Sequence, residues 1–146
     1  MEWQAGAMTL LRLGTLFSAI RFPRKLVLAA ASLSSRPVLP DAFLGEALAG
    51  GPVICDPHKD WYYALVPASV PEKYEQLAAF WRPLGVELLG RATYLGVPPL
   101  IVTEYEPQCG SYWAVPMSSA GVLCPPLAVA RVIEAERRAD AKSAGA

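Results

Sequence analysis

The chain has 146 residues, which is enough for one domain that buries a single core without disulfides or metals. It is 53% hydrophobic and 18% charged, and its formal net charge at pH 7 is zero. A neutral chain excludes a global electrostatic attraction to nucleic acid or to an anionic membrane. The apolar composition fits either a sheet-rich core with many Ala and Pro residues or a surface that a partner covers.

The cysteine count and the N-terminal residues bear on the compartment. Three cysteines are an odd number, which disfavours a closed disulfide framework. The first residues lack a basic leader, and Arg12, Arg21, Arg24 and Lys25 divide the longest apolar run, so that no stretch of 18 apolar residues occurs. We therefore expect a cytoplasmic protein with no membrane segment and no cofactor.

The first third of the chain predicts one strand and one helix. Residues 1–9 have the composition of a disordered lead-in, and Gly14 marks a bend. The β-rich run over residues 15–22 predicts a strand. Pro23 suits the first position of a helix, because its missing N–H would be unpaired there, and the Ala/Leu-rich run over residues 24–33 continues that helix. Ser, Ser, Arg and Pro then end it.

The middle of the chain predicts a helix and a hairpin. Residues 40–49 predict a short helix, which the Gly-Gly-Pro at residues 50–52 ends. The runs at residues 53–55 and 61–67 are typical of strands, and an Asp/Pro-containing turn at residues 56–60 separates them. This pattern predicts an antiparallel hairpin with a five-residue loop.

The last part of the chain predicts helices around three strands. Residues 72–81 have the apolar spacing of an amphipathic helix. Residues 86–89 and 93–97 predict a second hairpin, and residues 111–115 a final strand. A C-terminal helix is expected over residues 125–138.

This order of elements predicts an α+β fold. We expect one domain over residues 10–138, followed by a flexible tail at residues 139–146. Hairpins mixed with helices predict a mainly antiparallel sheet of five or six strands, with helices packed on one or both faces.

Several short motifs resemble a known family. Residues 86–100 read VELLGRATYLGVPPL, a strand with an acidic residue, a Gly-containing turn, a Tyr-hydrophobic strand and Pro-Pro. Tyr112-Trp113, the run WYYALVP at residues 61–67 and the run FSAIRF at residues 17–22 complete the pattern. Over about residues 10–135 the chain resembles the N-terminal domain of bifunctional DNA primase–polymerases, of the archaeo-eukaryotic primase superfamily.

The resemblance implies the fold of that family without its chemistry. Family members hold divalent metal with carboxylates, because Mg²⁺ must offset the charge that develops on the triphosphate. Here Ser18 and Arg21 stand where the family has Asp residues, and Asp60 stands in place of a nucleotide-contacting His. Only Glu87 matches an acidic family position. We expect an inactive polymerase site in which Glu87 pairs with Arg21.

Two binding functions remain open at this point. The first is a non-catalytic, primase–polymerase-like binding or regulatory module that acts through protein–protein contacts, with a protein partner or as a homo-oligomer. The second is a nucleic-acid or nucleotide binder that uses the basic N-terminal third and aromatic side chains on the sheet. The residues expected to bind in the second case are Arg21, Arg24, Lys25, Arg91, Tyr63, Tyr94 and Trp113.

The cysteines and the single histidine offer two further alternatives. Cys55 and His58 have Cys-x-x-His spacing and, with Cys109 and Cys124, form a candidate zinc set. Cys109 and Cys124 are 15 residues apart, unlike the usual knuckle, so inert cysteines are favoured. Cys55 with His58 is also a candidate nucleophile and base, although no orienting group is specified beyond Asp56 or Asp60.

Overall fold

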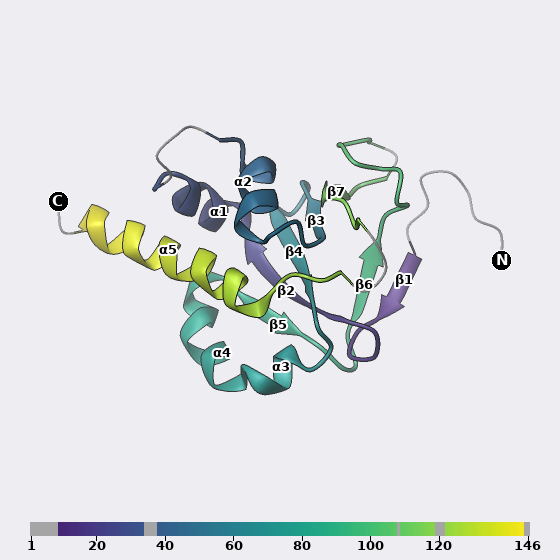
Figure 1. Cartoon of the computed structure of the whole chain (residues 1–146), viewed down its shortest axis with the longest axis horizontal. Helices are drawn as coiled ribbons and strands as arrows, with labels where there is room; N and C mark the ends of the chain where they lie inside the picture. Colours follow the sequence, from purple (N-terminus) through teal and green to yellow (C-terminus); the bar gives the residue numbers. More distant parts are fainter. Residues whose placement is uncertain (1–8, 34–37, 108, 119–121, 145–146) are drawn as a thin grey trace.

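Two antiparallel sheets organise the chain (Figure 1). The structure is a computed structural model that describes residues 9–33, 38–107, 109–118 and 122–144. The strands are β1 (Thr9–Arg12), β2 (Ser18–Pro23), β3 (Val53–Asp56), β4 (Trp61–Val66), β5 (Glu87–Leu89), β6 (Tyr94–Val97) and β7 (Tyr112–Val115). The helices are α1 (Arg24–Ala31), α2 (Pro40–Ala47), α3 (Val70–Lys73), α4 (Glu75–Trp81) and α5 (Pro126–Ala144), with a short 3-10 turn at Arg82–Leu84.

The larger sheet has the strand order β5-β2-β4-β3-β7, and all of its pairings are antiparallel. The predicted hairpin of β3 and β4 is confirmed, since Cys55 pairs with Tyr62 and Val53 with Ala64. β2 lies between β4 and β5, with Arg21 opposite both Tyr63 and Glu87. The predicted α+β domain is therefore confirmed, with a five-stranded sheet beside a two-stranded one.

Helices cover one face of the larger sheet. Side chains alternate across a strand, so Ile20 and Phe22 of β2 and Tyr62 of β4 point to the same side. On that side they join one buried cluster with residues of α1, α2, α4 and α5, including Leu26 and Ile133. In Figure 1 α1 and α2 lie above and to the left of the sheet, α5 to its left and α4 below it, on the side away from β1 and β6.

The small sheet and nearby loops cover part of the opposite face. Here Ala19, Leu65 and Trp113 of the larger sheet pack with Leu13 and with Leu95 of β6. β1 pairs with β6 along its full length. Gly14 makes the predicted bend between β1 and β2, with a φ of 94° that a residue bearing a Cβ rarely adopts.

The predicted hairpin over residues 86–97 is wrong. β5 and β6 are both present, but β5 pairs with β2 and β6 pairs with β1. The residues between them pass from the edge of the larger sheet to the smaller one instead of turning back. Pairing partners of strands are set by burial and long-range contacts, which a local pattern does not contain.

Three helix boundaries also differ from expectation. The helix predicted over residues 72–81 is divided at Tyr74, which leaves helical geometry with a φ of −107° and a ψ of 17°. Pro23 ends β2 and caps α1 in an extended conformation instead of forming its first turn. The backbone of α5 stays helical to Ala144, beyond the expected end at residue 138.

Two expectations fall outside the described residues. They are the first eight residues of the lead-in expected over residues 1–9 and the helix stop at residues 34–37. The last residue of that lead-in, Thr9, is not disordered, because it begins β1. Among the residues that are described, no helix combines the length and the apolar character needed to cross a bilayer.

Candidate functional site

The end of β2 and the turn between β3 and β4 meet at one place. Trp61, the first residue of β4, lies opposite Pro23, the last residue of β2. The backbone N–H of Arg24 donates a 2.8 Å hydrogen bond to the carbonyl of Asp60, which ties the start of α1 to the turn. Asp60 itself adopts a left-handed conformation with a φ of 58°. The turn is therefore held directly beside the first residues of α1.

The carboxylate of Asp56 shapes the turn from within. Its Oδ1 accepts hydrogen bonds from the backbone N–H groups of His58 and Lys59, at 3.2 and 3.4 Å. An Asp side chain that binds the backbone two residues ahead favours a turn over an extended chain. The expected five-residue loop is one residue shorter, because Asp56 belongs to β3 and pairs with Trp61, and the carboxylate of Asp56 closes the turn that follows.

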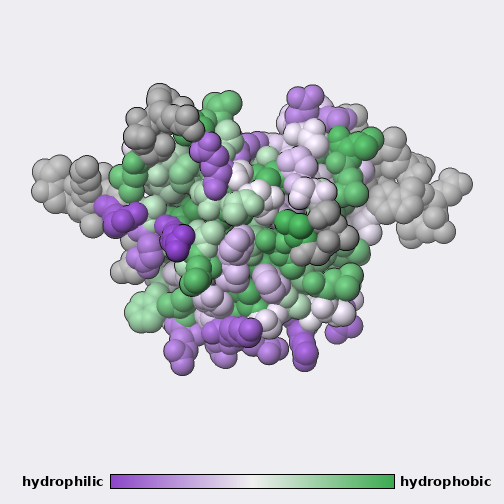
Figure 2. Space-filling model, in the orientation of Figure 1, coloured by the Kyte–Doolittle hydropathy of each residue, from purple (hydrophilic) through white to green (hydrophobic). Residues whose placement is uncertain are grey.

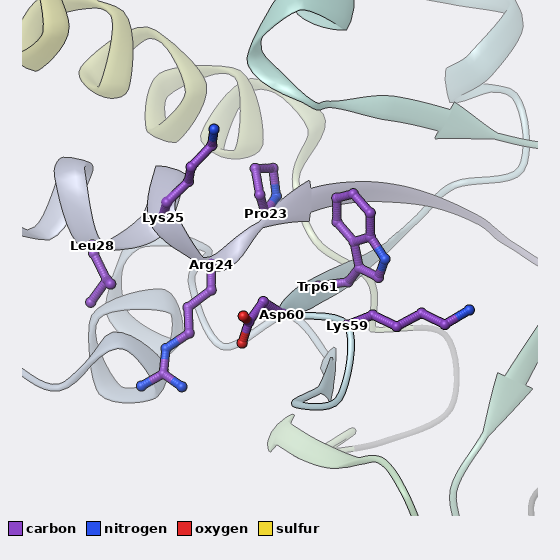
Figure 3. A pocket seen from close by; sticks show the side chains of 7 residues that line it. All are labelled: Pro23, Arg24, Lys25, Leu28, Lys59, Asp60 and Trp61. Atoms are coloured by element: carbon purple, nitrogen blue, oxygen red, sulfur yellow. The ribbon is translucent and has the colours of Figure 1, made fainter.

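A pocket of about 450 Å³ opens between these segments, a volume within the range of small-molecule sites. We call it the α1 pocket. Its lining residues are Pro23, Arg24, Lys25, Leu28, Lys59, Asp60 and Trp61. Figure 3 shows the side chains of Arg24, Lys25 and Lys59 pointing in different directions around the pocket. Such an arrangement suits an extended anion better than a single small ion.

The α1 pocket is cationic in a chain of zero net charge. Three of its lining side chains carry positive charge and one, Asp60, carries negative charge. Arg24, Lys25 and Lys59 are all exposed. In the described part of the chain no carboxylate lies within ion-pair distance of any of the three. Their charge is therefore available to a ligand.

Arg21 lies next to this pocket, between Glu87 and Trp61. Its Nη2 is 2.6 Å from Oε2 of Glu87, so the expected ion pair is confirmed. Its guanidinium carbon also lies 4.2 Å from the centre of the Trp61 ring, in cation–π contact. The guanidinium is thus held between a carboxylate on β5 and an indole on β4.

The residues that the resemblance predicted to form a degenerate acidic site are not all brought together in the described structure. Strand alternation places Ser18 on the helix-covered face with Ile20 and Phe22, whereas Arg21 points to the other face. Ser18 is fully buried, and its hydroxyl donates a 2.9 Å hydrogen bond to the carbonyl of Ala68. The expectation that Ser18 and Arg21 line a common site is therefore wrong.

Asp60 and Glu87 are likewise separate. Asp60 lines the α1 pocket, whereas Glu87 forms an ion pair with Arg21. Of the four residues Ser18, Arg21, Asp60 and Glu87, the structure brings only Arg21 and Glu87 into contact.

The expected nucleic-acid residues divide between the pocket and other surfaces. Arg24 and Lys25 line the pocket. Tyr63 lies opposite Arg21 on the neighbouring strand, half-buried, and burial raises its pKa above the ordinary value. These three residues are consistent with a ligand at or beside the α1 pocket.

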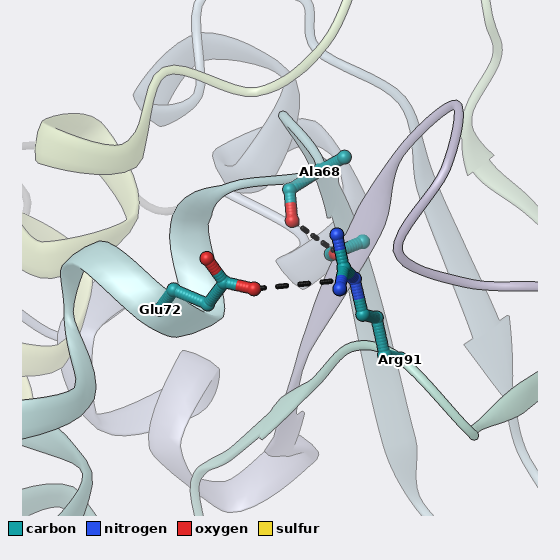
Figure 4. Close-up of polar contacts among 4 residues, drawn as sticks. Ala68, Glu72 and Arg91 are labelled. Atoms are coloured by element: carbon teal, nitrogen blue, oxygen red, sulfur yellow. Dashed lines mark hydrogen bonds and ion pairs between the residues drawn. The ribbon is translucent and has the colours of Figure 1, made fainter.

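Besides Arg21 and Tyr63, three more of the seven expected binding residues do not line the pocket. Arg91 lies elsewhere, with its Nε 4.0 Å from Oε1 of Glu72 (Figure 4). Tyr94 is exposed on β6, in the small sheet. Trp113 is wrong as a stacking residue, because it is 1% exposed and its Nε1 donates to the carbonyl of Pro98.

The cysteines form neither a metal site nor an activated nucleophile in the described chain. Cys55, Cys109 and Cys124 are buried free thiols. No group of three or more His, Cys, Asp or Glu side chains within the described ranges is placed to hold a metal ion, so His58 and the cysteines do not assemble the zinc set. Burial raises the pKa of Cys55 to about 11, which keeps it a thiol. The ring of His58 instead packs edge-on against Tyr105.

Sequence reasoning missed Lys59 and Trp61 as pocket residues. Trp61 was assigned to a strand and Lys59 to its turn, and nothing local connects either with Arg24. The sequence does show that the strand before α1 and the strand after the turn are both short and apolar. It does not show that these two strands pair. In the structure these strands pair with Pro23 opposite Trp61, and this register places the turn beside the start of α1.

Comparisons with known proteins add no relative. No protein-family model, curated protein or solved structure matches this chain.

Proposed function

We propose that this protein binds a nucleoside phosphate, as a free nucleotide or as part of a single-stranded nucleic acid, in the α1 pocket. The observation that carries the proposal is the combination, around one cavity, of an indole and three cationic side chains that form no ion pair within the described residues. Phosphate oxygens suit the cationic groups, and a base suits the indole, because every base has an aromatic face. This is the second of the two functions that the sequence left open, and the pocket now favours it.

The contacts that the pocket offers set an upper limit on the affinity. A hydrogen bond to a charged group contributes about 1.5–3 kcal/mol, and stacking of a base on an aromatic side chain about 1–3 kcal/mol. Two such phosphate contacts and one stack sum to about 4–9 kcal/mol. The upper end of this range corresponds to micromolar affinity only before the costs of association are subtracted. We expect moderate affinity that falls with salt, since the cationic groups are exposed.

Binding without nucleotide transfer is the form of the proposal that the residues support. The side chain at position 21 is a cation, and the acid beside it, Glu87, is neutralised by it. Ser18 is buried on the other face with its hydroxyl engaged. A polymerase-type reaction needs several carboxylates that converge on Mg²⁺, and these positions do not supply them.

A titration tests the proposal. Fluorescence anisotropy would follow a labelled adenosine triphosphate and a labelled oligothymidylate as the full chain is added at low salt. The variant Arg24→Glu/Lys59→Glu is expected to weaken binding of at least one probe by roughly 100-fold, at tenfold per reversed charge. The matched control is Arg82→Glu, which reverses an exposed charge in the 3-10 turn, and it should stay within about twofold.

Two results would contradict the proposal. One is equal weakening by Arg82→Glu, which would indicate a diffuse charge effect instead of a pocket. The other is no binding of either probe at low salt by the unsubstituted chain. Comparison of the two probes also separates a free nucleotide from a strand.

A protein partner is the second candidate, favoured by exposed apolar side chains on the small sheet and the following loop. Leu10 is 71% exposed, Tyr94 59%, Leu100 66% and Ile101 85%. Figure 2 shows apolar side chains on the side of the molecule where β6 and this loop lie. Light scattering tests self-association: a concentration-dependent rise in mass that Ile101→Ser abolishes supports this candidate, and a monomer at all concentrations argues against a homo-oligomer.

A further inference from the structure

Three neighbouring strands place one side chain each into a stack beside the α1 pocket. Glu87 on β5 and Arg21 on β2 are direct cross-strand partners, and Arg21 lies one strand away from Trp61 on β4. The carboxylate of Glu87 holds the guanidinium at 2.6 Å, and the guanidinium lies over the Trp61 ring at 4.2 Å. Of the three residues, only Trp61 lines the pocket.

We propose that Arg21 is a positioning residue that fixes the Trp61 ring for a ligand's aromatic group, and that Glu87 fixes Arg21. The inference rests on the proposed function, and deepens it by naming what orients the stacking surface. The guanidinium covers one face of the indole. A base in the pocket therefore meets the opposite face, in a sandwich of cation, indole and base.

The pose of Arg21 is set by its partners on both sides. Its side chain is 27% exposed, and its buried Nε–H has no acceptor among the described residues. The guanidinium is thus held through Nη2 by Glu87 and through its flat face by Trp61. Because Glu87 neutralises it, Arg21 contributes orientation more than charge to the pocket. This changes the role expected from the sequence, in which Arg21 was a direct phosphate contact.

The physical benefit is preorganisation. An indole on a strand end has several staggered rotamers, and a ligand that needs one of them must exclude the others. A flat cation on one face selects the rotamer before the ligand arrives. Lysine keeps the charge and can still pair with Glu87, but it lacks the planar face. Arg21→Lys therefore removes the stack and retains the ion pair.

The first experiment needs no ligand. The near-ultraviolet circular dichroism of the full chain minus that of Trp61→Phe gives the signal of an immobilised Trp61. The same difference in an Arg21→Lys background should fall by at least half, and Glu87→Gln should lower it in part. Unchanged far-ultraviolet spectra and urea midpoints show that the variants fold. A Trp61 signal that survives Arg21→Lys at full size overturns the proposal.

The second experiment compares ligands with and without a ring. Arg21→Lys should weaken adenosine triphosphate about fivefold and leave inorganic triphosphate within twofold, because only the former stacks on Trp61. In a Trp61→Ala background the same substitution should have no further effect on either ligand. Equal loss for both ligands would mean that Arg21 acts through charge or fold, and would overturn the positioning role.

Failure of the proposed function gives a different pattern. If the unsubstituted chain binds neither adenosine triphosphate nor the oligothymidylate, the binding function is refuted, while the dichroism experiment still decides whether Arg21 orients Trp61. Loss of the Trp61 signal in Arg21→Lys would then support orientation, and its persistence would refute it.

Discussion

The phenol of Tyr62 donates a 2.6 Å hydrogen bond to Oδ1 of Asp41, which joins the central strand β4 to the first turn of α2. Tyr112 on β7 donates to the other oxygen, Oδ2, at 2.8 Å. Tyr62 is 1% exposed, so this bond is made away from solvent. One carboxylate thus fastens a helix to two strands on the helix-covered face of the sheet.

Removal of this carboxylate should destabilise the fold. Asp41→Ala leaves the buried hydroxyl of Tyr62 without its acceptor, at a cost of about 1–3 kcal/mol in the free energy of unfolding. Urea denaturation followed by fluorescence measures it. The control is Tyr62→Phe/Asp41→Ala, in which the fully buried donor is gone and only the half-buried hydroxyl of Tyr112 lacks its acceptor, so part of the loss should be recovered. Equal stabilities of Asp41→Ala and the unsubstituted protein would contradict a structural role for the bond.

Stability should fall at alkaline pH because buried thiols and phenols resist ionisation. Burial raises the pKa of Cys55 from 9.0 to about 11, and that of Cys124 from 9.0 to about 12. The pKa of Tyr62 is raised in the same direction, by burial and then by its bond to Asp41. Below pH 9 the thiols are protonated in both states. Above pH 9 only the unfolded chain releases these protons, so the native state loses stability as pH rises toward 11.

Urea titrations at pH 8, 9, 10 and 11, with reductant present, would measure this decline. Cys55→Ala should reduce the loss of unfolding free energy between pH 9 and 11, because one of the thiols with a raised pKa is then absent. An unfolding free energy that does not change over this range would show that the thiols are not protected in the native state.

Gly51 should tolerate no side chain. A Cβ at this position would lie 2.6 Å from Cα of Cys124 and 2.8 Å from its backbone N. That backbone is fixed, because Cys124 N donates to the carbonyl of Leu65 at 2.7 Å and its Sγ donates to the carbonyl of Pro52 at 3.3 Å. We expect Gly51→Ala to lower the unfolding free energy by about 1–3 kcal/mol.

A matched glycine provides the control. Gly45 lies within α2, and a Cβ there would meet only Cγ2 of Val115, at 3.9 Å. Gly45→Ala should be neutral or stabilising by about 0.5–1 kcal/mol, because alanine loses less backbone freedom on helix formation. If both substitutions had the same effect on the urea midpoint, the close approach at Gly51 would not be the cause.

Magnesium should weaken the binding of a nucleoside triphosphate. The ion neutralises part of the phosphate charge that Arg24, Lys25 and Lys59 would attract, and the pocket lining offers it a single carboxylate, Asp60. Binding of labelled adenosine triphosphate should therefore be several-fold tighter with a chelator than with excess magnesium. Asp60→Asn should tighten binding in the chelator by roughly 2–5-fold, since it removes the one repulsive charge. A strict requirement for magnesium would contradict this account of the pocket.

Local patterns predicted the elements better than their neighbours. The hairpin of β3 and β4, the helix after Pro40 and the strand at Tyr112 follow from turn residues and short apolar runs, and all are confirmed. The pairing of β5 with β2 was missed, because it depends on which surface each strand buries. The break at Tyr74 was also missed, since the apolar spacing runs through it unchanged.

The site was predictable only in part, for the same reason. Arg24 and Lys25 were identified by charge alone, and the pair of Arg21 and Glu87 by the motif positions. Lys59 and Trp61 join them through the register of β2 and β4, which no local pattern supplies. Asp41 was overlooked as well, because its two tyrosine partners are distant along the chain.

The passage of the chain from β5 to β6 has a mechanical consequence. This short segment connects the two sheets. Within it, the carbonyl of Gly90 accepts a 3.1 Å hydrogen bond from the backbone N–H of Thr93. A force applied to the small sheet would therefore act on β5, the edge strand that carries Glu87. A partner bound to β1 and β6 would therefore lie on a sheet that the chain connects directly to the strand of Glu87.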